Sequence, residues 1–121
     1  MTDFLEILSR EVDNTDHIYL YPEGEYWYAY EQSACRLKQI IWDCRIQKVI
    51  NHTYEVVLIC VQISRKQLDN ELEEIMYSRP NSCLSDGYFD IPLSTQSSVY
   101  FDMWKQTEFL KEITCIEIRK G

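Results

Sequence analysis

Residues 54–63, YEVVLICVQI, constrain the fold more than any other stretch of this sequence. Their side chains are nearly continuously apolar, whereas a strand with one solvent-facing side alternates apolar and polar residues. A run of this kind is typical of a central strand that is covered on both faces. We therefore expect a β-sheet in which this strand lies inside and helices flank the sheet.

The other elements are predicted from changes in the apolar period, which is two residues in strands and three to four in helices. The predicted strands are residues 17–21, a strand from Tyr26 after a turn at 22–25, then 44–50, 54–63, a short strand at 88–93, and 113–119 at a sheet edge. The predicted helices are residues 3–12 with Phe4, Leu8 and Val12 on one face, a helix from Tyr30, one capped by Ser64 that ends at Ser78, and 99–111 capped by Ser98. This order predicts an α/β (α+β) fold, with a mixed sheet of five or six strands flanked by helices.

Size and composition predict one domain spanning residues 1–121. With 45% hydrophobic and 26% charged residues, and only three Gly and three Pro, the chain has a globular composition with little room for linkers. The five cysteines are odd in number and widely separated, so we interpret them as reduced thiols. The first residues carry no basic signal region, and the longest apolar run, 56–61, is far shorter than a membrane span. We expect a cytoplasmic protein that neither crosses a membrane nor is secreted.

Charge restricts the possible partners. The chain has 20 acidic and 12 basic side chains and a net charge of -8, which argues against broad affinity for nucleic acid because phosphates must be neutralised by Lys and Arg. Residues 36–48 are the exception, with Arg36, Lys38, Arg45 and Lys48 against Asp43 alone. Any basic patch is expected there; the other interpretation is a solvated helix end and strand face.

Motifs that carry chemistry are missing from the sequence. It contains no phosphate-binding loop, Gly-rich dinucleotide turn, Gly-x-Ser-x-Gly elbow or His-Glu-x-x-His helix. The two histidines, His17 and His52, belong to separate predicted elements, and no Cys-x-x-Cys pair is present. We therefore expect no enzyme, no cofactor and no metal site.

Aromatic residues are concentrated in one short segment. Six of them fall within twelve residues: Tyr19, Tyr21, Tyr26, Trp27, Tyr28 and Tyr30. Exposed rings on adjacent strands can stack on bases, at about 1 to 3 kcal/mol per base. The other interpretation is cross-strand aromatic pairing and core packing. The sequence leaves both open.

The same segment carries a family resemblance. Residues 20–34, LYPEGEYWYAYEQSA, resemble the N-terminal mismatch-recognition domain (domain I) of MutS DNA repair proteins, with Tyr21, Gly24, Glu25, Tyr26 and Ala34 at the corresponding positions. Residues 59–75, ICVQISRKQLDNELEEI, resemble a later strand and helix of that domain more weakly. The resemblance implies a MutS N-terminal-like fold in which Tyr26 takes the place of the aromatic wedge. Tyr28 stands where the family has the base-reading Glu, and the MutS ATPase has no counterpart here.

These observations favour a non-catalytic binding module for a protein partner. The candidate binding residues are Tyr26, Trp27, Tyr28, Arg36, Lys38, Arg45 and Lys48. The alternative is a nucleic-acid-binding module that binds single-stranded or distorted DNA through the same aromatic rings and the same Arg and Lys side chains. A small enzyme ranks third.

Overall fold

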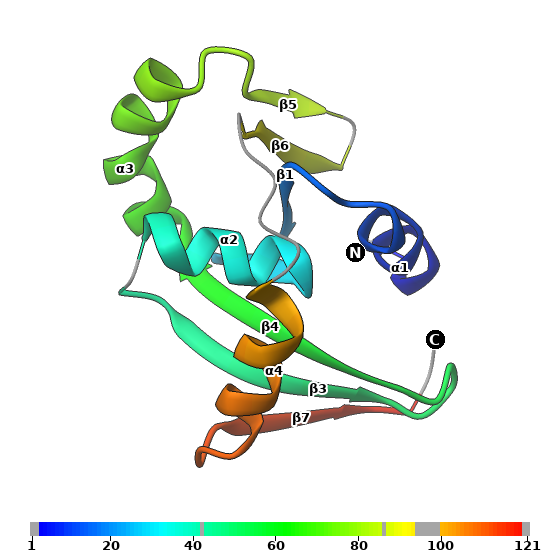
Figure 1. Ribbon diagram of the computed structural model, residues 1–121. Helices are drawn as coiled ribbons and strands as arrows, with labels where there is room; N and C mark the ends of the chain where they lie inside the picture. The colour runs from blue at the N-terminus through cyan, green and yellow to red at the C-terminus, as the bar shows by residue number, and fades with distance from the viewer. Residues whose placement is uncertain (1–2, 42, 86, 94–99, 120–121) are drawn as a thin grey trace.

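The computed structural model describes residues 3–41, 43–85, 87–93 and 100–119. Within them the chain forms four helices and seven strands (Figure 1). In chain order these are α1 (Phe4–Val12), β1 (His17–Glu23), β2 (Tyr26–Tyr30), α2 (Gln32–Ile40), β3 (Arg45–Asn51), β4 (Val56–Ser64), α3 (Arg65–Ser78), β5 (Cys83–Ser85), β6 (Tyr88–Pro92), α4 (Phe101–Phe109) and β7 (Thr114–Ile118).

The strands form one mixed sheet in the order β5-β6-β1-β2-β4-β3-β7. Neighbours are antiparallel except β3 and β7, which are parallel. The predicted α/β (α+β) class, with a mixed sheet flanked by helices, is confirmed. The predicted count of five or six strands is wrong, because the described residues form seven. The three-residue strand β5 lies in a stretch without apolar alternation and is held by pairing with β6.

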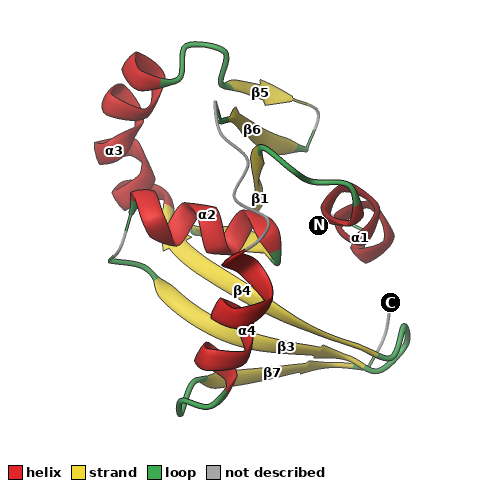
Figure 2. Cartoon of the chain, viewed as in Figure 1, coloured by secondary structure: helices red, strands yellow, loops and turns green. Residues whose placement is uncertain are grey.

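Helices cover the two faces of the sheet unequally (Figure 2). Side chains of α2, α3 and α4 pack on one face, around Ile59, Val61 and Ile63 of β4. On the other face only α1 packs among the described helices, against Leu58 and Cys60 of β4. The central strand is therefore buried on both faces along most of its length, as its sequence predicts.

Two elements differ from their predicted form. In α1 the buried residues are Phe4, Ile7 and Glu11, whereas Val12 is 79% exposed. Of the predicted stripe, Phe4 is buried and Leu8 is half-buried against the same core, and the prediction is wrong at Val12. The helix turns Glu11 inward instead, to meet polar partners. The turn after β1 is also shorter than predicted, since its strand runs on to Glu23 and pairs with Tyr26.

The predicted helix caps are partly present. The Asp3 side chain accepts a hydrogen bond from the backbone of Leu5, and Ser64 Oγ accepts one from Gln67. Both match the predicted helix starts. The predicted cap at Ser98 lies outside the described residues. The second helix starts at Gln32 rather than Tyr30, because Tyr30 still pairs with Cys60 in the sheet.

Candidate interaction surface

The structure separates the seven predicted binding residues. Tyr26, Tyr28 and Arg45 lie on the sheet face that α1 partly covers. Trp27 points to the opposite face, is 9% exposed and belongs to the core there. The prediction of Trp27 as a contact residue is therefore wrong, because its side chain is part of the core. Side chains alternate along a strand, so Tyr26 and Trp27 cannot share a face.

Tyr26, Tyr28, Gln62 and Arg45 form a surface that we call the open face, and Gln47, which is 4% exposed, lies buried beside them. Tyr28 lies opposite Gln62 across β2 and β4, and Gln62 lies opposite Arg45 across β4 and β3. Gln62 Nε2 donates to the Tyr28 hydroxyl at 3.0 Å, and Gln47 Nε2 lies 3.5 Å from Gln62 Oε1. Rings, amides and a guanidinium thus follow one another across three strands.

This end of the sheet has no helix over it among the described residues. Helix α1 packs over the other end of the same strands, where Phe4 meets Tyr30 edge to face with ring centroids 5.8 Å apart. Tyr26 is consequently 41% exposed and Arg45 is exposed, while Tyr28 is half-buried. The open face therefore offers two tyrosines, polar groups and one cation to a partner.

The aromatic segment contains both rings packed in the core and rings that are partly exposed. Tyr21 and Tyr30 are buried beneath α1, where burial raises the pKa of Tyr21 to about 12 and also raises that of Tyr30. The guanidinium of Arg10 lies 3.8 Å from the ring centroid of Tyr88, which in turn meets Tyr19. Core packing thus accounts for most of the rings, and Tyr26 and Tyr28 remain as contact candidates.

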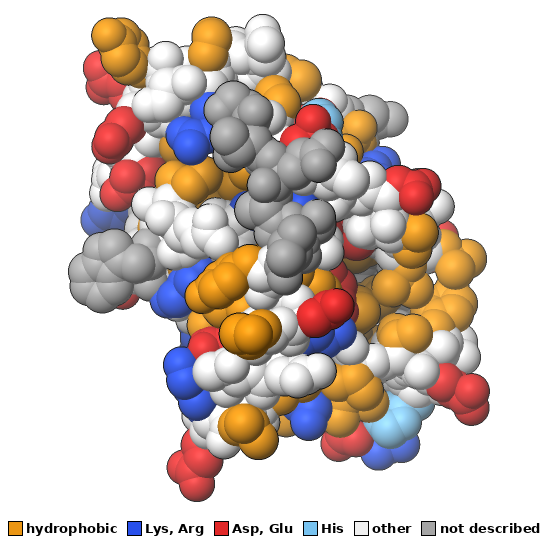
Figure 3. Space-filling view, viewed as in Figure 1, with side chains coloured by type: hydrophobic (Ala, Val, Ile, Leu, Met, Phe, Trp, Pro, Cys, Tyr) orange, Lys and Arg blue, Asp and Glu red, His pale blue; other side chains and the backbone are white. Residues whose placement is uncertain are grey.

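The predicted basic patch is dispersed. Arg36 is 1% exposed, and its guanidinium donates to Asn14 Oδ1 at 2.8 Å and to the His17 carbonyl at 2.9 Å. Lys38 Nζ donates to the Cys44 carbonyl at 3.0 Å, and Lys48 Nζ lies 5.1 Å from the Phe109 ring centroid on the opposite sheet face. Arg45 is therefore the member of the set that shares a face with Tyr26. On the side of the molecule shown in Figure 3, the described Lys and Arg side chains are likewise scattered among Asp and Glu.

Sequence reasoning missed a buried polar cluster, which we call the Glu11 cluster: Glu11, Asn14, Ser33 and Arg36. The Glu11 carboxylate accepts hydrogen bonds from the Ser33 backbone at 3.1 Å and from Asn14 Nδ2 at 3.2 Å. Burial raises the pKa of Glu11 to about 7, against the lowering effect of these donors. The sequence signal that could have indicated its burial is the spacing of Glu11 with Phe4 and Ile7 at i, i+3 and i+7, which places the three on one helix face.

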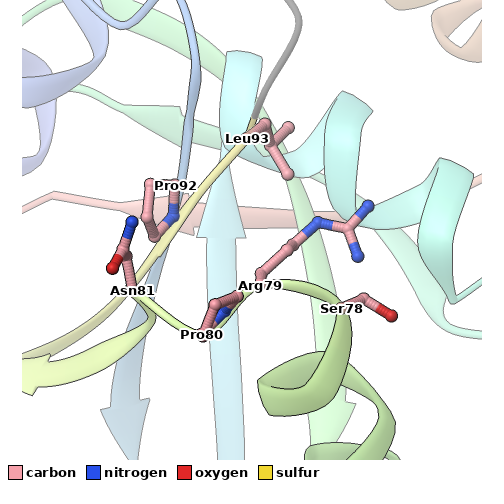
Figure 4. A pocket seen from close by; sticks show the side chains of 6 residues that line it. All are labelled: Ser78, Arg79, Pro80, Asn81, Pro92 and Leu93. Atoms are coloured by element: carbon pink, nitrogen blue, oxygen red, sulfur yellow. The ribbon is translucent and has the colours of Figure 1, made fainter.

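The cavity in Figure 4 lies between the end of α3 and the end of β6, with a volume of about 380 Å³. The described residues that line it are Ser78, Arg79, Pro80, Asn81, Pro92 and Leu93. Their side chains include one cation and two small polar groups, and none of these six carries a carboxylate, an imidazole or a thiol. The described part of the lining therefore supplies no general base or strong nucleophile.

The histidines bind separate carboxylates. His17 Nδ1 lies 2.6 Å from Asp90 Oδ1, and His52 Nε2 lies 2.9 Å from Glu117 Oε1. Within the described part of the chain, no three His, Cys, Asp or Glu side chains gather closely enough to hold a metal ion. None of the helices formed by the described residues is long and apolar enough to cross a membrane.

Comparison of the chain with family models, curated proteins and solved structures gives no match. The resemblance to the MutS N-terminal domain therefore stays a prediction from the sequence.

Proposed function

We propose that this chain is a non-catalytic, cytoplasmic binding module that binds a protein partner through the open face. The observation that supports this proposal is the sheet end that no helix of the described residues covers, where Tyr26 and Tyr28 lie beside Gln62 and Arg45. Tyrosine and arginine are enriched at protein interfaces, since each combines a large contact area with polar groups that tolerate water. All five cysteines are free thiols in the structure, which is consistent with a reducing compartment.

The charge around the open face favours a protein over a nucleic acid. Glu23 and Glu25 flank the turn beside Tyr26, and both are exposed. Arg45 is the one predicted basic residue on this face, whereas a duplex or strand needs several cations along its phosphates. The alternative function, suggested by the MutS resemblance, is binding of single-stranded or distorted DNA with Tyr26 as the wedge. A small enzyme remains the third proposal.

Affinity capture with matched variants tests the proposal. The double variant Tyr26→Ala/Tyr28→Ala removes both rings, and Tyr77→Ala removes a ring that is 90% exposed on α3. We expect the wild-type chain and the Tyr77→Ala variant to capture a common partner in similar amounts. The double variant should capture at least tenfold less of it, because tyrosines are frequent interface hot spots. A partner set that is identical for all three chains contradicts the role of the open face.

Fluorescence anisotropy with labelled single-stranded, matched and mismatched DNA tests the alternative. The protein-partner proposal expects no binding at low salt. Micromolar binding that weakens with salt and disappears in Tyr26→Ala would instead establish the DNA-binding alternative.

A further inference from the structure

A second cavity lies beside the open face, between α1 and the strands β1 and β2. Four of its lining side chains are buried, whereas Glu23 is exposed and Tyr28 is half-buried and belongs to the open face as well. We call this space the tyrosine cavity, and its described lining residues are Phe4, Ile7, Tyr21, Pro22, Glu23, Tyr28 and Tyr30. Its volume is about 10 Å³, which is room for one group of about the size of a water molecule.

The lining of the tyrosine cavity combines aromatic rings with one carboxylate. Tyr21 lies opposite Tyr28 across β1 and β2, and Glu23 lies opposite Tyr26. Because Tyr21 and Glu23 are two residues apart on one strand, the carboxylate and these rings share one face of the sheet. The face of an aromatic ring carries partial negative charge and attracts cations. The cavity and its mouth therefore offer a cation both aromatic rings and a full negative charge.

Glu23 has no basic partner in the described part of the chain. None of the ion pairs that the described residues form includes this carboxylate, which is exposed at the end of β1. Residues 1–31 contain eight acidic side chains against Arg10 alone, and the whole chain has a net charge of -8. This charge distribution favours a basic partner over an acidic one.

Two positive groups of α1 lie near the tyrosine cavity, and each is already balanced. The positive N-terminal end of the helix is capped by the Asp3 side chain. Arg10 donates to the Tyr21 hydroxyl at 3.5 Å, but its guanidinium lies over the Tyr88 ring and pairs with Glu6 at 3.7 Å. Arg10 is not one of the described lining residues, so the cavity is left to a cation from outside.

We propose that the partner of the open face inserts a lysine side chain into the tyrosine cavity, with its ammonium group beside the Glu23 carboxylate and the Tyr28 ring. A primary ammonium is a compact charge of about the size of a water molecule, whereas a guanidinium or a trimethylammonium is larger than the space available. The Tyr28 hydroxyl already accepts a hydrogen bond from Gln62 Nε2, and its second lone pair can accept one from the ammonium. This inference rests on the proposed function and adds the chemistry of the partner, a segment with an exposed lysine.

Peptides that differ at one position test which cation is bound. The probes are acetyl-Gly-Ser-Xaa-Ser-Gly-amides in which Xaa is lysine, arginine, trimethyl-lysine or norleucine, titrated into the full chain and followed by NMR chemical shifts. We expect the lysine peptide to bind with a Kd in roughly the millimolar range, because one side chain supplies most of the contact. The arginine and trimethyl-lysine peptides should bind at least about threefold more weakly. The norleucine peptide, which has no side-chain charge, should not bind detectably.

Glu23→Gln and Glu25→Gln form a matched pair of variants. Each removes one exposed carboxylate and changes the net charge equally, but of the two only Glu23 lines the tyrosine cavity. Glu23→Gln should weaken binding of the lysine peptide by about fivefold, and Glu25→Gln by less than about twofold. Circular dichroism checks that both variants are folded.

Three results overturn the inference: no binding of the lysine peptide, arginine or trimethyl-lysine peptides that bind as tightly as lysine, or equal losses in the two glutamate variants. Failure of the inference alone is recognised by affinity capture. The Tyr26→Ala/Tyr28→Ala variant then still loses its partner, whereas Glu23→Gln keeps it and the lysine peptide does not compete. A partner set that is identical for the wild type and the tyrosine variant overturns the proposed function, and this inference with it.

Discussion

Glu11 is an acid held inside the interface between α1 and α2. Its carboxylate accepts hydrogen bonds from Ser33 and Asn14, and Asn14 Oδ1 also accepts from the buried guanidinium of Arg36. The cluster joins the end of α1, the loop before β1 and the first turn of α2. A buried charge costs free energy even when it is hydrogen-bonded, and the raised pKa of Glu11, about 7, expresses that cost.

We expect the Glu11 cluster to make stability depend on pH near neutrality. In the folded chain the pKa of Glu11 is about 7, against 4.5 as its ordinary value, so between these values the folded state holds a proton that the unfolded state lacks. The free energy of unfolding should therefore fall as pH rises through this window, by at most about 3 kcal/mol, and level off above it.

Glu11→Gln isolates this effect from the other titrating groups. We expect urea unfolding from roughly pH 5 to pH 8 to show that the free energy of unfolding of the wild type falls as pH rises. The variant, which lacks the titrating carboxyl, should show a flatter dependence on pH. Parallel curves for the two chains would contradict the assignment.

Glu31 carries backbone strain at the junction of β2 and α2. Its φ of 53° lies in the left-handed region, and its carboxylate binds Lys105 Nζ at 2.7 Å. A non-glycine residue in such a conformation costs about 1 to 3 kcal/mol. Glu31→Ala should lose the ion pair and keep the strain, whereas Glu31→Gly should lose the pair and relieve the strain.

We therefore expect Glu31→Gly to be more stable than Glu31→Ala by about 1 kcal/mol, although glycine has the more flexible unfolded chain. Thermal or urea unfolding of the two variants measures this difference. A less stable glycine variant would show that the conformation of Glu31 carries no strain.

At the scale of elements, the sequence predicted most helices and strands but not every face. Periodicity located β4, α3 and β7 because apolar spacing and caps are local properties. In α1 it located the helix but missed Glu11 on the packed face, because the partners that draw Glu11 inward, Ser33 and Arg36, are 22 and 25 residues further along the chain. β5 was missed because three residues are too few to show alternation.

The candidate site was predictable only in part, for the same reason. Alternation along β2 could have separated Tyr26 and Tyr28 from Trp27, since neighbouring side chains point to opposite faces. Nothing local indicates that Arg36 is buried while Arg45 is exposed, because that depends on which strands lie side by side. The position of α1 over only one end of the sheet likewise depends on tertiary contacts.

The orientation of α1 gives a direct test at this scale. Ile7 is buried against the sheet, whereas Val12, which the sequence placed on the packed face, is exposed. We expect Ile7→Ala to lower the free energy of unfolding by about 2 to 4 kcal/mol and Val12→Ala to change it by less than about 0.5 kcal/mol. Equal losses in urea unfolding would indicate the helix orientation that the sequence predicted.

At the scale of the whole molecule, the two core faces share one sheet. Cys60 of β4 lies beneath α1, and Cys35 of α2 packs with Ile59 and Phe101 on the opposite side. Both thiols are buried, and burial raises the pKa of each, so neither reacts readily in the folded chain. Since β4 contributes side chains to both faces, loss of one core should expose the other.

Thiol labelling during urea unfolding tests whether the chain is one cooperative unit. In the C83S/C115S background, which removes the two exposed thiols, we expect Cys60 and Cys35 to become reactive at the same urea concentration, as in a two-state transition. Half-buried Cys44 provides an internal reference for partial access. Labelling of Cys60 at clearly lower urea than Cys35 would mean that α1 detaches before the rest of the sheet unfolds. The Glu11 cluster would then be the first tertiary contact to break, and the Glu11→Gln variant should shift the labelling of Cys60 without shifting that of Cys35.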